Sequence, residues 1–176
     1  MVVGKYMLGW CALLAGSFAL SGCTSLLMGK QYEFPRPDEP SATVRVKYDR
    51  GTTLDAMTFN EKSCYAGYTP LSYNGDFIES KVAVGKELVL TYRDVVGSTQ
   101  CQIPFSFTPE EGAVYTIKTG FWSETKPGII PVFKYDQYHC GIGVVKKVGD
   151  QESVQPIQQL RIKTGFACLK FLPVTK

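Results

Sequence analysis

Apolar and polar residues alternate with a period of two in six segments of the chain, and this alternation constrains the fold more than any other feature. In residues 43–48 the apolar side chains occupy one parity and the polar ones the other, as a β-strand with one buried face requires. The remaining segments are residues 87–92, 101–107, 115–117, 138–144 and 159–163. No ten-residue stretch shows a helical repeat free of proline and glycine, so we predict a mostly β chain.

Turn residues separate these segments and indicate how the strands are connected. Asn74 and Gly75 suit a two-residue hairpin turn, and residues 109–112, Pro-Glu-Glu-Gly, supply a fixed φ followed by a residue free to adopt positive φ. Short strands joined by such turns favour an antiparallel β-sandwich of immunoglobulin-like or transthyretin-like type. A small β-barrel is the second candidate fold.

The first 23 residues have the three-part layout of a secretory signal peptide. Lys5 precedes a weakly polar to apolar stretch of 13 residues, 7–19, and the segment Leu20-Ser21-Gly22-Cys23 follows. A helix needs about 20 residues to cross the hydrocarbon core of a bilayer. A cleaved signal is therefore favoured over a permanent membrane span.

Leu20-Ser21-Gly22-Cys23 resembles the lipobox of bacterial lipoproteins. The resemblance implies cleavage before Cys23, diacylation of its thiol and acylation of the new amino group, with palmitate among the chains. An ordinary signal peptide that happens to end in a cysteine is the alternative. Thr24 and Ser25 follow the cysteine where inner-membrane lipoproteins carry Asp, which resembles the class destined for the outer membrane.

The chain is thereby divided into three parts. Residues 1–22 are the predicted signal peptide, and residues 23–41 the lipidated tether, which carries three prolines and interleaved charges without periodicity. Residues 42–176 are the predicted folded domain, of a size that suits one domain with its own core.

Residues 82–86, Cys101 and residues 105–117 together resemble small uncharacterised lipoproteins of Gram-negative envelopes. These proteins carry a similar valine-glycine turn, a cysteine, and a proline-glycine turn before a strand that bears a tyrosine. The resemblance supports the fold and brings no established activity with it.

Four cysteines remain in the predicted domain, Cys64, Cys101, Cys140 and Cys168. An even number in an exported domain predicts two disulfides. A metal site is the competing interpretation, but no two of these cysteines lie within a few residues of each other. Three pairings are possible, and sequential pairing, Cys64 with Cys101 and Cys140 with Cys168, is the working hypothesis.

The sequence offers little for catalysis or for nucleic-acid binding. His139 is the one histidine, and its parity is opposite to that of Tyr138 and Cys140, so we expect it on an outer face rather than in a Cys140–His139 dyad. No G-x-S-x-G, H-E-x-x-H, P-loop or dinucleotide motif occurs. After removal of residues 1–22, 18 basic and 16 acidic groups remain. We therefore expect no enzyme, no cofactor, no metal site and no nucleic-acid partner.

Residues 121–131 are the main candidate contact surface. They are predicted to connect two strands, yet Phe121, Trp122, Ile129 and Ile130 are more apolar than a plain connection requires, and aromatic anchors dominate binding hot spots. The alternative is that these side chains fold back and close the end of the sandwich. A second candidate surface contains Tyr65, Tyr68 and Tyr73.

These features together predict a lipid-anchored lipoprotein of the outer membrane, with its domain in the periplasm or at the cell surface. We expect it to act by contact, as a structural, assembly or accessory factor with an envelope protein partner. The alternative function is that of a periplasmic small-ligand-binding protein or an inhibitor of a hydrolase.

Overall fold

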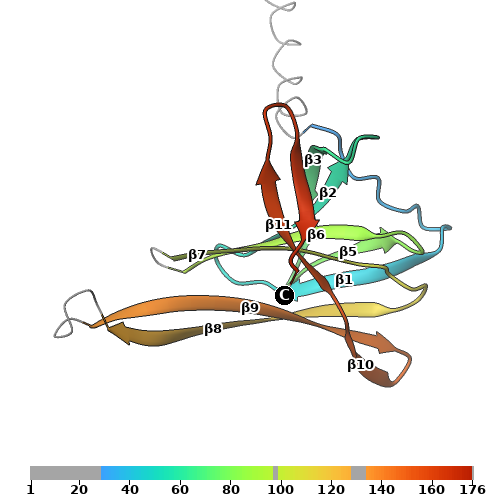
Figure 1. Cartoon of the computed structure of the whole chain (residues 1–176). Helices are drawn as coiled ribbons and strands as arrows, with labels where there is room; N and C mark the ends of the chain where they lie inside the picture. The colour runs from blue at the N-terminus through green and yellow to red at the C-terminus, as the bar shows by residue number, and fades with distance from the viewer. Residues whose placement is uncertain (1–28, 97–98, 128–133, 176) are drawn as a thin grey trace, which may run out of the picture.

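The computed structural model describes residues 29–96, 99–127 and 134–175, and these form twelve strands in two six-stranded sheets (Figure 1). The first sheet has the order β10-β9-β8-β1-β5-β4 and contains β1 (Ser41–Lys47), β4 (Tyr73–Asn74), β5 (Phe77–Ala83), β8 (Val114–Pro127), β9 (Lys134–Val148) and β10 (Gln151–Gln155). The second has the order β12-β11-β7-β6-β2-β3 and contains β2 (Thr53–Phe59), β3 (Tyr65–Pro70), β6 (Leu88–Val96), β7 (Thr99–Phe107), β11 (Gln158–Thr164) and β12 (Leu169–Pro173).

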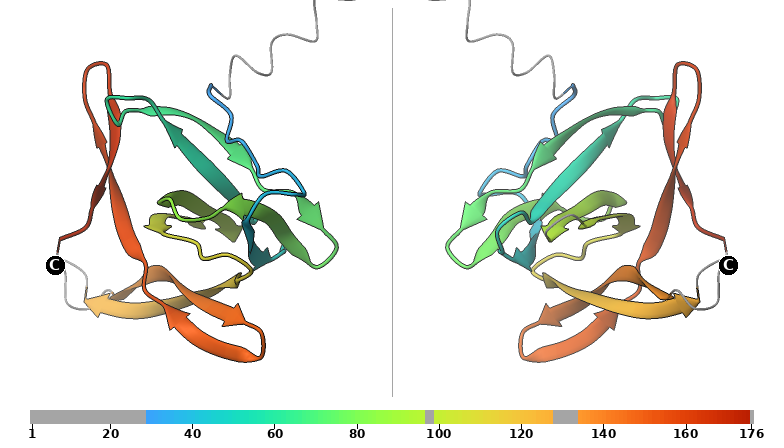
Figure 2. Two further views of the ribbon diagram at one scale, coloured as in Figure 1. Left: turned by 90° about the vertical axis from the view of Figure 1, so that its right-hand side faces the viewer. Right: turned by 90° about the vertical axis from the view of Figure 1, so that its left-hand side faces the viewer.

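The predicted all-β class and two-sheet antiparallel architecture are confirmed. Among the described strands, β1 with β8 is the one parallel pair, and every other ladder is antiparallel. The two sheets lie around a shared interior, and the β11–β12 hairpin extends along one side of it (Figure 2). In the described part of the chain, no helix has the length and apolar character needed to span a bilayer.

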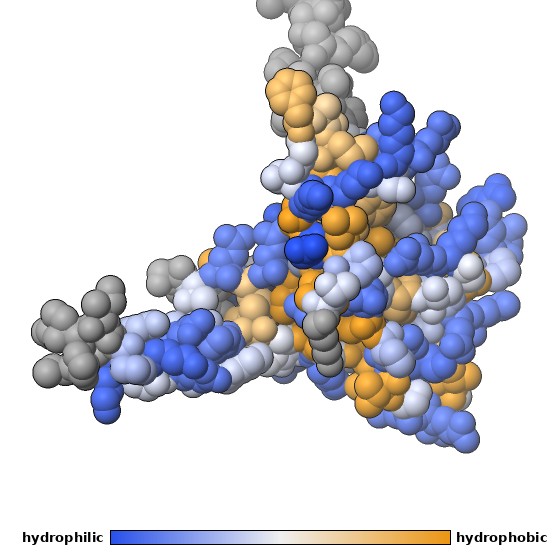
Figure 3. Space-filling view, in the orientation of Figure 1, coloured by the Kyte–Doolittle hydropathy of each residue, from blue (hydrophilic) through white to orange (hydrophobic). Residues whose placement is uncertain are grey.

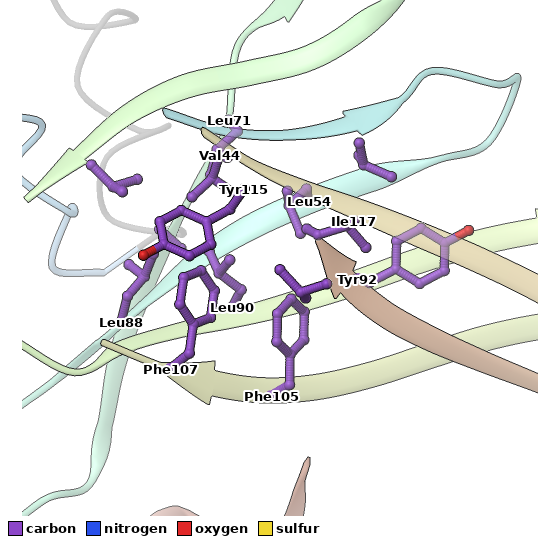
Figure 4. Packing of buried hydrophobic residues seen from close by; sticks show 14 of the residues in the cluster. Val44, Leu54, Leu71, Leu88, Leu90, Tyr92, Phe105, Phe107, Tyr115 and Ile117 are labelled. Carbon is purple, nitrogen blue, oxygen red and sulfur yellow. The ribbon is translucent and has the colours of Figure 1, made fainter. Parts of the chain in front are cut away.

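The core is made by the inward parity of strands from both sheets (Figure 4). In β1 every second residue is buried, and Val44 and Val46 are less than 2% exposed. The rings of Phe107 and Tyr115, which come from different sheets, lie with centroids 4.7 Å apart. Along β8 the buried residues end at Ile117, so the rest of this strand projects beyond the core.

Both predicted turns are present. Asn74 pairs with Phe77, so the hairpin turn is centred on Gly75 and Asp76, one residue later than predicted, and Gly75 has a φ of 62°. Gly112 ends the second turn with a φ of 70°. Its backbone N–H donates to the carbonyl of Ser41 at 3.0 Å, which attaches this turn to the start of β1.

The domain-proximal part of the predicted tether lies against the second sheet. Gly29 forms a bridge with Gly67, and the N–H of Lys30 donates to the carbonyl of Ala66 at 2.9 Å. The phenol of Tyr32 accepts a hydrogen bond from the N–H of Ala83 at 3.0 Å, and burial raises the pKa of that phenol. The folded body therefore begins by residue 29 rather than at residue 42.

The predicted signal peptide (1–22), the lipidation of Cys23 and the tether residues 24–28 all lie outside the described residues. They stay predictions.

Both disulfides are present, but the sequential pairing was wrong. Cys64 is bonded to Cys168, and Cys101 is bonded to Cys140, with Cα–Cα distances of 5.2 and 6.1 Å. The pairing is nested, with the Cys101–Cys140 bridge inside the Cys64–Cys168 loop, because position in the fold and not order in the chain brings cysteines together. Cys64 and Cys168 lie beside hairpin turns of the second sheet. Cys101 in β7 faces Cys140 in β9 across the two sheets.

Candidate functional site: a projecting hairpin arm

The β8–β9 hairpin continues well past the core as a two-stranded ribbon. The ladder runs from the pair Lys118–Gly143 to the pair Pro127–Lys134, whereas β1 stops pairing with β8 at Ile117 and β10 stops pairing with β9 at Val144. Figure 1 shows the ribbon extending beyond the other strands. We call residues 118–127 and 134–143 the arm, and within the described chain neither of its outer edges has a partner strand.

The structure places Phe121 and Trp122 inside strand β8 of the arm, not in a connection as predicted. The connection comprises residues 128–133, and the candidate contacts Ile129 and Ile130 therefore lie outside the described residues. Trp122 is 50% exposed and Phe121 is 44% exposed, so neither ring closes the end of the core. Their role in partner contact stays a prediction.

Trp122 is held in place on one side only. It pairs with His139 across the ribbon, and the two rings are stacked with centroids 5.5 Å apart and an interplanar angle of 14°. A Cβ atom at Gly141 would lie 3.2 Å from Cζ3 of the indole. The glycine therefore lets the indole lie close to the ribbon, while the other ring face stays accessible.

His139 lies on the ribbon face opposite to Cys140, as its parity predicts. The sulfur of Cys140 is bonded to Cys101, so no thiol is available to form a dyad with the imidazole. His139 Nε2 is buried without a hydrogen-bond partner in the described structure, and the nearest carboxylate oxygen, on Glu124, is 3.9 Å away. This arrangement resembles an aromatic stack more than an acid–base pair.

Two more aromatic residues of the arm, Tyr135 and Tyr138, are exposed but were not among the predicted contact residues. Tyr135 is 55% exposed and Tyr138 is 65% exposed. Tyr138 has the same parity as Cys140 and was therefore interpreted as facing the core. Where the ribbon extends past the core, side chains on both of its faces are exposed to solvent. The alternation of apolar and polar residues does not indicate at which residue the core ends.

A cleft of about 440 Å³ lies at the base of the arm. Trp122 and the Cys140–Ile142 segment of β9 line one wall, and Ile157 and Val174 line the other. The cleft adjoins the stretch of β9 that has no neighbouring strand, so an apolar side chain from a bound segment could enter here beside the indole.

The second predicted surface is divided between two places. Tyr65 and Tyr68 line a pocket of about 200 Å³ together with Arg93 and Phe171, and the Arg93 guanidinium lies 5.9 Å from the centroid of the Tyr68 ring. Tyr73 lies apart from them in β4, on the first sheet, and packs on Tyr48 with ring centroids 4.7 Å apart.

The positive charge of Arg93 in this pocket is paired with the carboxylate of Asp55. Its Nε donates to Asp55 Oδ2 at 3.1 Å, and Asp55 is 1% exposed. Asp55 Oδ1 and the Thr91 hydroxyl are buried, and neither has a hydrogen-bond partner among the described residues.

Other groups capable of chemistry are occupied or dispersed. Glu110, one of the two adjacent glutamates of the second turn, accepts hydrogen bonds from Lys146 Nζ at 2.9 and 3.0 Å. Within the described ranges, no three His, Cys, Asp or Glu side chains gather in a way that could hold a metal ion.

Comparison with known proteins finds no matching family model, no similar curated protein and no similar solved structure. Function is therefore argued from the geometry.

Proposed function

We propose that this chain is a lipid-anchored cell-envelope lipoprotein that acts by contact, as a structural, assembly or accessory factor and not as an enzyme. We place it at the outer membrane, with its domain in the periplasm or at the cell surface. The observation that carries the contact role is the arm, whose two edges are unpaired in the described structure and whose aromatic side chains are exposed.

An isolated two-stranded ribbon is marginally stable in water, and its free edges invite pairing with other strands. The arm carries charges that discourage indiscriminate pairing, Lys118, Glu124, Lys126, Lys134 and Asp136. A specific partner could add a strand to the β9 edge and fill the cleft beside Trp122. Main-chain hydrogen bonds would then supply affinity, and the aromatic rings would supply specificity.

The envelope location is supported by two independent features. Leu20-Ser21-Gly22-Cys23 has the form of a lipobox. The two disulfides suit an oxidising compartment outside the cytoplasm.

The anchor is tested by Cys23→Ser in the full chain. We expect an unprocessed precursor with altered gel mobility, because the acylated thiol is what the lipoprotein peptidase requires. A matched Cys11→Ser variant, within the predicted signal peptide, should mature normally. Unchanged maturation of Cys23→Ser would remove the lipid anchor from the proposal.

The contact role is tested by placing a photo-crosslinking phenylalanine analogue at Tyr138 in cells. Tyr73 is a matched control, because it is also a tyrosine and is 63% exposed, against 65% for Tyr138, but lies on β4. We expect one crosslinked partner from Tyr138 that is absent from Tyr73 and is weakened by Trp122→Ala. Equal products from both positions, or none from Tyr138, would contradict the arm as the contact surface.

The alternative, binding of a small ligand, is favoured by one observation, the tyrosine-lined pocket, one of whose lining residues, Thr91, has a buried hydroxyl without a hydrogen-bond partner in the described structure. A thermal-shift screen with small aromatic compounds that carry a hydrogen-bond donor would test it. A stabilising compound whose effect is lost in Tyr68→Ala but kept in Trp122→Ala would support the ligand-binding function.

A further inference from the structure

The β11–β12 hairpin presents one large apolar side chain to solvent from a rigid turn. Its last pair is Thr164 with Leu169, and the N–H of Gly165 donates to the carbonyl of Cys168 at 2.9 Å, which closes the turn around Phe166. The Cys64–Cys168 disulfide fixes this turn to the one between β2 and β3. Phe166 has a relative exposure of 110%, so the fold displays this ring without covering any part of it.

The strands below this turn carry positive charge. Lys163 and Lys170 are directly paired across the hairpin and are both exposed, and Arg161 lies two residues further down β11. No Asp or Glu follows Glu152 in the sequence. Like charges directly opposite each other on a hairpin are destabilising unless an anionic partner compensates them.

The neighbouring turn between β2 and β3 does not neutralise this charge. It contributes Glu61 and Lys62, and Lys30 lines the same depression of the surface. Figure 3 shows apolar residues at the tip of the hairpin and hydrophilic residues along its sides. An apolar tip above a cationic collar suits the interface of an anionic bilayer, where a ring enters the headgroup region and cations meet phosphates.

The point where the chain enters the folded body lies at the same end. Gly29 pairs with Gly67, three residues after Cys64, which is bonded to Cys168 near the hairpin tip. Six residue steps separate Cys23 from Gly29, and they span at most about 20 Å. A lipid on Cys23 would therefore keep this end of the domain close to the bilayer.

We propose that the tip of the β11–β12 hairpin rests on the bilayer that holds Cys23, with Phe166 in the interface and Lys163 and Lys170 facing anionic headgroups. This inference rests on the lipid anchor of the proposed function. It adds a second, non-covalent membrane contact, which sets the orientation of the domain. The rigid turn favours this contact, because a displayed side chain that is already ordered loses little freedom on binding.

The test is fluorescence quenching in the mature full chain, reconstituted in vesicles of phosphatidylcholine and phosphatidylglycerol with bromine on the acyl chains. Phe166→Trp supplies the probe and Tyr73→Trp the control, and both carry Trp122→Phe to lower the background. We expect the emission of the Phe166→Trp variant to be shifted to shorter wavelength and quenched by brominated lipid, with no change in the Tyr73→Trp variant.

Three results would overturn the inference. The first is an anchored protein in which neither probe is quenched. The second is equal quenching of both probes, which would mean that the domain has no fixed orientation. The third is a blue shift of the Phe166→Trp variant without quenching by brominated lipid, which would mean that a protein or a second copy of this chain covers the tip.

The charge contribution is measured separately in the unlipidated mature chain, residues 23–176 with Cys23→Ser and without the predicted signal peptide, added to the same vesicles, so that failure of the anchor and failure of the hairpin are distinguishable. Replacing Lys163 and Lys170 together by Gln should weaken sedimentation with anionic vesicles by roughly 30-fold. The matched pair Lys81→Gln and Lys86→Gln removes equal charge from exposed positions elsewhere. An equal loss in both pairs would assign binding to net charge and contradict the hairpin contact.

Discussion

Removing the Cys101–Cys140 disulfide should loosen the arm more than any other part of the molecule. The bridge closes a sequence separation of 39 residues, and the double variant Cys101→Ala, Cys140→Ala is expected to lose about 4 kcal/mol of unfolding free energy in the chain-entropy model. Cys140 lies within the arm, close to its base, because β9 has no second neighbouring strand before Val144 in the described structure. Most of the arm is stabilised only by the hydrogen bonds between β8 and β9.

Guanidinium unfolding gives the size of the loss, and amide hydrogen exchange read by mass spectrometry gives its location. We expect faster exchange in residues 118–127 and 134–143, with smaller changes in β1 and β6. The control is Cys64→Ala, Cys168→Ala, whose separation of 104 residues predicts a loss of about 5 kcal/mol. Its faster exchange should appear in the β11–β12 hairpin instead.

The reasoning would be refuted if both double variants gave the same exchange pattern, or if the arm kept its protection without Cys101–Cys140. In either case the disulfides would act through the unfolded chain alone and not by holding the projections. Peptide mapping of the unreduced protein must also give the nested pairs.

Three further predictions concern single side chains. Trp122→Ala should lower the free energy of unfolding by about 1 kcal/mol, because half of the side chain is already exposed to solvent. Phe105 is fully buried, so Phe105→Ala should lower it by about 3–5 kcal/mol, and equal thermal midpoints of the two variants would contradict this. Arg93→Ala should lower the free energy of unfolding by about 3 kcal/mol, measured in urea, because it leaves the buried carboxylate of Asp55 without its ion-pair partner. Arg93→Lys should restore part of the loss, and unchanged stability of Arg93→Ala would contradict the prediction. Burial, assisted by a hydrogen bond to a carboxylate, raises the pKa of Tyr92 to about 12. The folded state then keeps a proton that the unfolded chain releases near pH 10, so stability should fall between pH 10 and 12, and Tyr92→Phe should reduce this fall; Tyr32, whose pKa burial also raises, keeps a part of it.

The strands predicted from sequence were those whose apolar and polar residues alternate along the chain. Residues 43–48 correspond to β1, in which burial alternates as well. Residues 101–107 correspond to β7, in which residues 103–107 are all buried although apolar and polar residues alternate. β2 was missed because its apolar residues occupy both parities, Leu54 and Ala56 on one and Met57 and Phe59 on the other. The outer face of the second sheet is partly covered there by the β11–β12 hairpin, whose Phe171 packs on Phe59 of β2 with ring centroids 5.5 Å apart. A strand that carries apolar residues on both faces loses the period of two.

The candidate site was located by residue type rather than by pattern. Phe121 and Trp122 were noticed because they are large and aromatic, but their strand was interpreted as a connection. Residues 123–127, Ser-Glu-Thr-Lys-Pro, are polar at both parities because neither face of the ribbon is covered. The disulfide pairing was equally beyond the sequence, since spacing along the chain does not determine which turns lie together in the fold.

The positions of the disulfides bear on why such a chain would project two hairpins. A core that spans both sheets holds the body, yet each disulfide has one end in a projection, Cys140 in the arm and Cys168 at the turn of the β11–β12 hairpin. Strand β7 connects the arm with the β11–β12 hairpin. Its Cys101 is disulfide-bonded to Cys140 of the arm, and its Ser106 pairs with Gln158 of β11. The orientation of the arm relative to the proposed membrane contact is thus fixed through one strand. A partner bound along the arm would be held at a set height above the bilayer, which suits a factor that positions another protein and needs no catalytic groups of its own.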